Sequence, residues 1–475
     1  MKEFYRKNKL MLYILLITVV ATSAPLYTDF ILFGEDVGAT LGRIRAFSDG
    51  ILRMLPVRIQ PLGNQDYGYS AAAFSSDVFY FLPGALYRAG LSLELSYKYT
   101  VLVFNVLTAI ISYTAFAYMA DEKLAGMSAA FAYMLCPARI YSVYMAGNFG
   151  ELFGWCFIPL ALMGIWALYS KKDMRTALYL LVLGYSLLLL SSTVFFVGGA
   201  VLYAILFLVH IRDNIRKESI IFNLKAVMIF VTVNLWFLFP MLSRMRNASA
   251  VAPLLKAYIR NYGVYLSQYF RVYEFAGVSS DTWINGTEST RAVGPGFAVI
   301  LVLISYIILC FVRGGRSRTA NRILALSAVF MLMSSNHFPW DIIQNKNLLF
   351  SIILAFTEMP VKFAVTADAL LIAAFAVIIS GYGKELKEKA YTYIIAVICL
   401  LDYILFQFQM GRIMIGRAFM RGEDILNNAD VGYVLIYDEA AVWRVSELVS
   451  AVSLVVIIAI IIINNKGRKH ADGND

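Results

Sequence analysis

Charged residues are scarce in this sequence. Asp, Glu, Lys and Arg make up 15% of its 475 residues, whereas 60% of the positions are hydrophobic. A soluble domain has about 25% charged residues and roughly half apolar ones. The composition therefore excludes an ordinary soluble enzyme and predicts a chain that lies mostly in lipid.

Cysteine and histidine are also rare, with four and three residues respectively. Each cysteine lies inside an apolar run and no CxxC spacing occurs, which excludes a zinc cage and a disulfide framework. His210, His337 and His470 are far apart in the chain. They do not predict a metal site built on several imidazoles.

The sequence is instead rich in long apolar runs. A membrane-spanning helix needs about 20 mostly apolar residues. Runs that approach this length lie at 10–33, 99–120, 124–141, 152–170, 177–191, 194–211, 219–241, 296–312, 323–335, 364–382, 390–409 and 446–464. We therefore expect an all-α integral membrane protein with about twelve transmembrane helices, in which residues 1–475 form one polytopic domain.

The first run has the basic start of a secretory signal, but Pro25 follows Ala24 in a poor context for cleavage. We interpret it as an uncleaved first helix. An even number of spans places both termini on one side of the cell membrane. The basic residues of segment 1–9 predict that this side is the cytoplasm.

The net charge of +10 is concentrated in the predicted cytoplasmic segments. The 51 residues of 1–9, 121–123, 171–175, 212–218, 313–322, 384–389 and 465–475 hold 21 of the 41 basic and 10 of the 31 acidic residues. This excess of cations is typical of cytoplasmic loops. It predicts a lipid environment and requires no nucleic-acid partner.

The predicted outer loops are longer than the inner ones and cover 34–98, 139–151, 242–295, 336–363 and 410–445. Soluble nucleotide donors are normally absent outside the cell. Group transfer on this side would therefore draw on a lipid-carried or extracellular substrate.

The first outer loop begins with two adjacent carboxylates, Glu35 and Asp36. Either could act as a general base towards a hydroxyl group or bind a hard divalent cation. Arg43 and Arg45 follow and suit a phosphate group. The alternative for Asp36 is a helix cap, because a helix is expected over 37–47. Asp77 lies in the apolar stretch 71–93, which we expect to lie at the membrane interface or to re-enter the membrane without crossing it.

This loop resembles that of the GT-C glycosyltransferases, which are membrane enzymes that use polyprenyl-phosphate-linked sugars. More closely, the chain resembles bacterial membrane proteins called "6-pyruvoyl-tetrahydropterin synthase-related" and the related YfhO-like proteins. The matching segments of the first outer loop are Gly34, Asp36, Arg43-Ile44, Tyr67-Gly68-Tyr69 and Asp77–Pro83. Those further along the chain are Asn148–Glu151, Phe157–Leu160, Trp236–Met241, Phe338–Trp340 and Met359–Phe363.

The resemblance implies the roles of the site residues. Asp36 would be the base, with Glu35 or Glu151 assisting, and the side chains that face the donor phosphate would include Arg43 and Lys362. Arg45, Asp77 and Trp340 would complete the substrate-binding groups. On spacing alone, Glu151 also suits a helix N-terminus and Lys362 suits an ion pair with Glu358.

Three departures from the family pattern keep other functions open. Thr40 stands where the family has His, Ser191-Ser192-Thr193 replaces another His, and Val361-Lys362 replaces Trp-Arg. Pterin synthesis is excluded because the three histidines fall on opposite sides of the predicted membrane. The alternatives to a glycosyltransferase are a transporter or flippase for a lipid-linked substrate and a non-catalytic scaffold. The donor sugar, the acceptor and the need for a divalent cation are not predicted.

Overall fold

The structure is a computed structural model of the chain. It describes residues 13–32, 34, 36–52, 75–170, 173–245, 259–270, 292–313, 317–346, 360–416, 419–421 and 425–426. The predicted final span, 446–464, and most of the predicted loop 410–445 lie outside this part of the chain.

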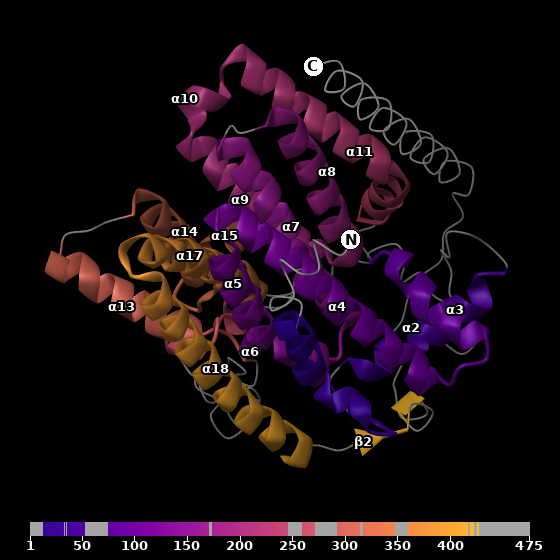
Figure 1. The fold of residues 1–475 in the computed structure, drawn as a ribbon. Coiled ribbons are helices and arrows are strands. Elements are labelled where there is room, and N and C mark those ends of the chain that lie inside the picture. The colour runs from indigo at the N-terminus through magenta and orange to yellow at the C-terminus, as the bar shows by residue number, and fades with distance from the viewer. Residues whose placement is uncertain are drawn as a thin grey trace, which may run out of the picture.

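Helices form almost all of the described structure. The α-helices are Tyr13–Thr22, α2 (Val37–Gly50), α3 (Phe81–Arg88), α4 (Leu93–Ala120), α5 (Lys123–Leu135), α6 (Pro137–Ile140), α7 (Phe149–Ser170), α8 (Met174–Ser191), α9 (Thr193–Val209), α10 (Ile211–Asn214), α11 (Lys217–Met245), α13 (Phe297–Arg313), α14 (Arg318–Ser334), α15 (Trp340–Lys346), α17 (Phe363–Glu385) and α18 (Glu388–Gly416). Figure 1 shows their arrangement.

Shorter elements connect these helices. They are the 3₁₀-helices η1 (Ala24–Tyr27), η3 (Val78–Tyr80), η6 (Ile259–Tyr262), η7 (Leu266–Phe270) and η9 (Pro360–Lys362), the π-helix η4 (Tyr141–Ala146), and the strands β1 (Ile31–Leu32) and β2 (Phe419–Met420). The two strands pair antiparallel and join the segment before α2 to the segment after α18.

The predicted all-helical membrane architecture is confirmed. Six helices within the described residues are long and apolar enough to cross a membrane, and three shorter apolar helices accompany them. Eleven of the twelve predicted runs overlap one of the helices given above.

The prediction that residues 10–33 form a single helix was wrong. The α-helix ends at Thr22, and a 3₁₀ turn with Pro25 near its start follows it. Proline lacks the N–H group that would continue the helix. The run 124–141 is divided in the same way, because α5 ends before Pro137.

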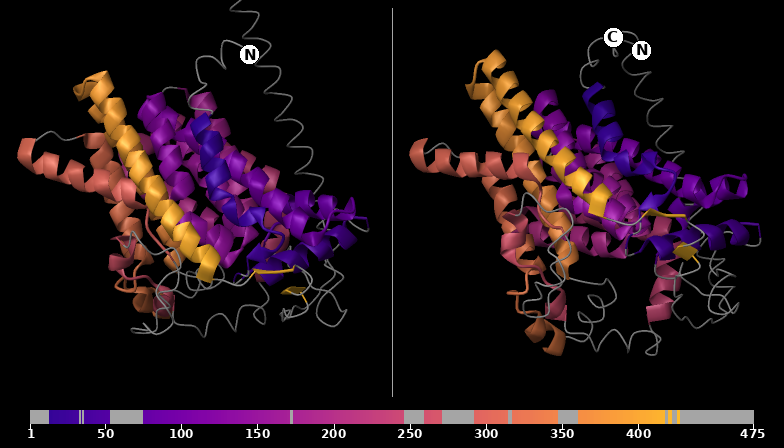
Figure 2. Two further views of the ribbon diagram at one scale, coloured as in Figure 1. Left: turned by 60° about the horizontal axis from the view of Figure 1, so that its bottom comes forward. Right: turned by 90° about the horizontal axis from the view of Figure 1, so that it is seen from below.

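Helix α17 lies at the centre of the bundle. Its apolar window is 94% buried, and it contacts α14, α5, α4, α13 and α9. In contrast, the apolar windows of α11 and α18 are only 22% buried. Helix α13 projects from the bundle in both views of Figure 2, and its Phe311 is 81% exposed. Apolar faces of this size need lipid around them.

Candidate functional site

The site begins where the segment before α2 meets the turn between η4 and α7. Gly147 has a left-handed backbone (φ +68°), and a Cβ atom there would come within 2.1 Å of Val37. A Cβ on Gly34 would come within 2.6 Å of the Met145 carbonyl oxygen. Only glycine permits both contacts. The approach lets the Asp36 N–H group donate to the Ala146 carbonyl oxygen at 2.7 Å. π-helical turns such as η4 occur frequently beside functional sites.

Asn148 connects Asp36 to α7. Its Nδ2 donates to Asp36 Oδ2 at 3.1 Å, and its Oδ1 accepts from the Glu151 backbone N–H at 3.2 Å. Asp36 occupies the N-cap position of α2, but its side chain makes no capping hydrogen bond. The carboxylate therefore faces the α7 terminus, where it is only partly buried.

Glu151 and Lys362 form a buried ion pair that joins the starts of α7 and α17. Their side chains are 3% and 6% exposed, and Lys362 Nζ donates to Glu151 Oε1. A cation at a helix N-terminus is unfavourable on its own, so the carboxylate stabilises Lys362 where α17 begins. Glu358, the partner suggested by spacing, lies outside the described residues. The contact to Glu151 brings together residues 211 positions apart.

Trp340 packs against the residue that follows Lys362. Its side chain is fully buried and stacks on Phe363 with ring centroids 5.9 Å apart. Phe338 packs against the same indole at 4.6 Å. Trp340 therefore supports the start of α17 and fixes the backbone that carries Lys362.

Arg43 and Asp77 form a second ion pair, which links α2 to the segment before η3. Arg43 Nη2 donates to Asp77 Oδ1, and the guanidinium also donates to the Ser75 hydroxyl and carbonyl oxygens, each at 3.0 Å. It lies 4.2 Å above the Tyr80 ring. Since Arg43 is seven residues beyond Asp36, both lie on one face of α2.

The predicted site residues are thus partly brought together. Asp36, Glu151 and Lys362 are joined through Asn148. The Arg43–Asp77 pair is connected to them only through aromatic rings, because Tyr80, which lies against Arg43, packs on Phe149 at 5.7 Å. Arg45 lies on an exposed position of α2, and Glu35 lies outside the described residues.

Sequence reasoning missed two members of this arrangement, Asn148 and Tyr80. Asn148 carried a signal, since asparagine is a preferred N-cap residue and stands directly before the apolar run of α7. Tyr80 carried none, because a cation–π contact between residues 37 positions apart depends on tertiary structure. The apolar segment around Tyr80 did not indicate which of its residues would face α2.

A divalent cation is not assigned to the site. Among the described residues, no group of three or more His, Cys, Asp or Glu side chains could hold a metal ion.

Two further acids lie in apolar helices. Asp368 is fully buried and accepts the Gly294 N–H at 3.2 Å. Asp402 accepts the Ala298 N–H at 3.1 Å. Both carboxylates contact the chain that leads into α13, so each satisfies a backbone donor that would otherwise be buried unpaired.

The fold defines a polytopic membrane protein built from α-helices. No family model and no curated protein matches the sequence. The solved structures that resemble this chain include two of an oligosaccharyltransferase from the archaeon Archaeoglobus fulgidus. The apo form has a TM-score of 0.45 at 13% identity. The AglB complex with an inhibitory peptide and a dolichol-phosphate has a TM-score of 0.43 at 14% identity. In each case the similarity covers 85% of this chain and 56% of the other. A likeness of this size assigns neither a family nor an activity, so the function is argued from the site.

Proposed function

We propose that the protein is a GT-C-like glycosyltransferase. It moves a sugar from a polyprenyl-phosphate donor to an acceptor on the extracytoplasmic side of the cell membrane. The observation that carries the proposal is the linkage of Asp36, Asn148, Glu151 and Lys362 at one end of a lipid-embedded bundle. These contacts connect a partly exposed carboxylate, through Asn148 and Glu151, to a cation at the start of the central helix.

The proposed step uses the carboxylate as a base. Asp36 accepts the proton of an acceptor hydroxyl while that oxygen bonds to the anomeric carbon of the donor sugar. The bond from this carbon to the donor phosphate oxygen breaks, and polyprenyl phosphate leaves with the electron pair. The nearby cations, Lys362 and Arg43, stabilise the negative charge on the leaving phosphate. Arg45, on the exposed side of α2, attracts the donor headgroup, and Glu35 assists the base.

The two ion pairs also favour a second candidate, a scaffold that has kept the fold without the chemistry. Lys362 and Arg43 each already contact a carboxylate, and all four side chains are mostly buried. A donor phosphate would have to compete with Glu151 and Asp77 for these cations. In a scaffold the same pairs would serve only to hold α2, α7 and α17 together.

The substitution Asp36→Asn separates the two functions. In membranes supplied with a polyprenyl-phosphate sugar and acceptor, we expect transfer to fall by about 10²-fold or more, the usual contribution of a general base. Asp49→Asn is the matched control, because Asp49 lies on the same helix and outside the site. Both variants should have the unfolding temperature of the natural protein.

Full retention of transfer by Asp36→Asn at normal expression contradicts the catalytic assignment. A natural protein that transfers no sugar from any polyprenyl-phosphate donor, and whose two variants behave alike, supports the scaffold.

A further inference from the structure

A cavity of about 270 Å³ lies at the end of the bundle away from Asp36. It is enclosed by the last turns of α7 and α9, the first turns of α14 and residues from α4 and α17. From Glu151 to Tyr169, α7 rises about 27 Å at 1.5 Å per residue. The cavity is therefore separate from the proposed active site.

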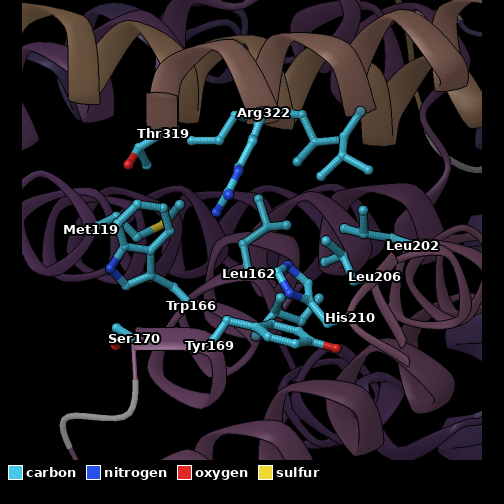
Figure 3. Close-up of a pocket in the computed structure, with 14 residues that line it drawn as sticks. Met119, Leu162, Trp166, Tyr169, Ser170, Leu202, Leu206, His210, Thr319 and Arg322 are labelled. Carbon is cyan, nitrogen blue, oxygen red and sulfur yellow. The ribbon is translucent and has the colours of Figure 1, made fainter. Parts of the chain in front are cut away.

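Arg322 supplies the charge of this cavity. Its side chain extends from α14 into the space, towards Leu162 on the opposite wall (Figure 3). Among the described residues, it has no ion-pair or hydrogen-bond partner, and no Asp or Glu belongs to the described lining. An exposed guanidinium without a carboxylate beside it is a forked donor for an anionic group.

The start of α14 adds to this preference. Thr319, in the first turn, also lines the cavity, and the helix runs for 17 residues. Its N-terminal end carries partial positive charge. On the other wall, the rings of Tyr169 and His210 lie 4.8 Å apart. The lining thus includes polar and basic groups from both walls.

The interior of the cavity is apolar. Its walls include Leu162, Leu202, Leu206 and Leu370. Trp166 and Tyr169 also line the cavity (Figure 3), and such amphipathic rings are common at the boundary of lipid and water. A free anion would contact only the polar groups of the cavity. An amphiphile would contact both these groups and the apolar walls.

We propose that this cavity binds an anionic phospholipid, with the phosphate at Arg322 and part of one acyl chain against the leucines. Basic pockets between helices at the cytoplasmic surface are suited to lipid headgroups. Arg322 also belongs to one of the basic segments that the sequence places in the cytoplasm. The volume is below that of a typical pocket for a whole ligand, so most of the lipid would lie outside the cavity.

Lipid binding to the purified full chain in detergent tests this proposal. Phosphatidylglycerol, phosphatidylcholine and inorganic phosphate would be titrated separately, with bound lipid measured by native mass spectrometry and the unfolding temperature recorded. Phosphatidylglycerol should bind and raise the unfolding temperature. Equal binding of phosphatidylcholine, or an equal shift with inorganic phosphate alone, would overturn the assignment to an anionic lipid.

Three variants locate the binding site. Arg322→Gln should weaken phosphatidylglycerol binding by about 10-fold, since a charge-assisted hydrogen bond contributes on that order. Arg318→Gln is the matched control, because Arg318 is exposed on the same helix and does not line the cavity. Leu206→Trp keeps the charge but fills the apolar part, and should also reduce binding.

Equal losses in Arg322→Gln and Arg318→Gln would mean that surface charge alone attracts the lipid. Binding by Leu206→Trp at the affinity of the natural protein would place the lipid elsewhere. Either result contradicts the proposal. Because Arg322→Gln alters an exposed side chain, it tests the site even where the cavity-filling variant folds poorly.

Discussion

Lys362 illustrates how a single side chain depends on its surroundings in this protein. Its ammonium group is buried at the start of α17 and donates to Glu151. Burying a charge without a partner is costly, whereas a paired charge costs much less. The pair therefore fixes how α7 and α17 meet, whether or not the residues take part in a reaction.

A double-mutant cycle on this pair gives the first residue-scale prediction. Glu151→Gln leaves a buried cation without its counter-charge and should lower the free energy of unfolding by about 3–5 kcal/mol. Lys362→Met should cost a similar amount. The double variant should be less destabilised than the sum of the two, as measured by thermal unfolding in detergent.

Arg260 and Asp341 provide the comparison for this cycle. Their ion pair, at 3.2 Å, is exposed on both sides, and exposed pairs contribute about 0–1 kcal/mol. Additive effects of Glu151→Gln and Lys362→Met would show that the buried pair is not coupled.

At the scale of elements, the position of α2 depends on the turn before α7. Gly147→Ala should destabilise the protein, because alanine at φ +68° is strained and its Cβ would overlap Val37. We expect a loss of about 1–3 kcal/mol. The same change should separate Asp36 from Asn148 and so reduce any sugar transfer.

Gly90→Ala is the matched control for the turn. Gly90 also has a positive φ, of +98°, but a Cβ there would meet no atom within 4 Å. It should show backbone strain without loss of transfer. If Gly147→Ala keeps full transfer and stability, the close approach at Val37 does not position the site.

The expected helices follow directly from the apolar runs, and their ends follow from local chemistry. Pro25 and Pro137 account for the two interrupted runs. The sequence could not predict which face of each helix is buried, since the apolar residues of α4 and α7 are not confined to one side of the helix. Contacts such as Asn148 with Asp36, 112 residues apart, depend on how the helices pack.

At the scale of the whole molecule, the predicted topology is open to a direct test. Cysteine introduced at Lys217, in the basic segment where α11 begins, should react with a membrane-impermeant maleimide only in permeabilised cells. Cysteine at Tyr262, in the loop at the Asp36 end, should react in intact cells. Both positions are exposed.

The natural chain serves as the background for this labelling, because Cys136 and Cys156 are buried. Cys310 and Cys399 are partly buried and would be replaced by serine if they react. Labelling of Lys217→Cys in intact cells would show that the orientation is opposite to the predicted one. The proposed active site would then lie in the cytoplasm.

The sequence by itself determined that this chain is a helical membrane protein, because a shortage of charge and a series of long apolar runs leave few other structures for the backbone. It also indicated that the basic residues gather in the loops on one side of the membrane. Only the tertiary structure decided that Lys362 contacts Glu151, that Asn148 holds Asp36, and that Arg322 faces a cavity. Apolar runs specify helices through local hydrogen bonds and hydropathy, whereas partners far apart in sequence are set by the packing of whole helices against one another.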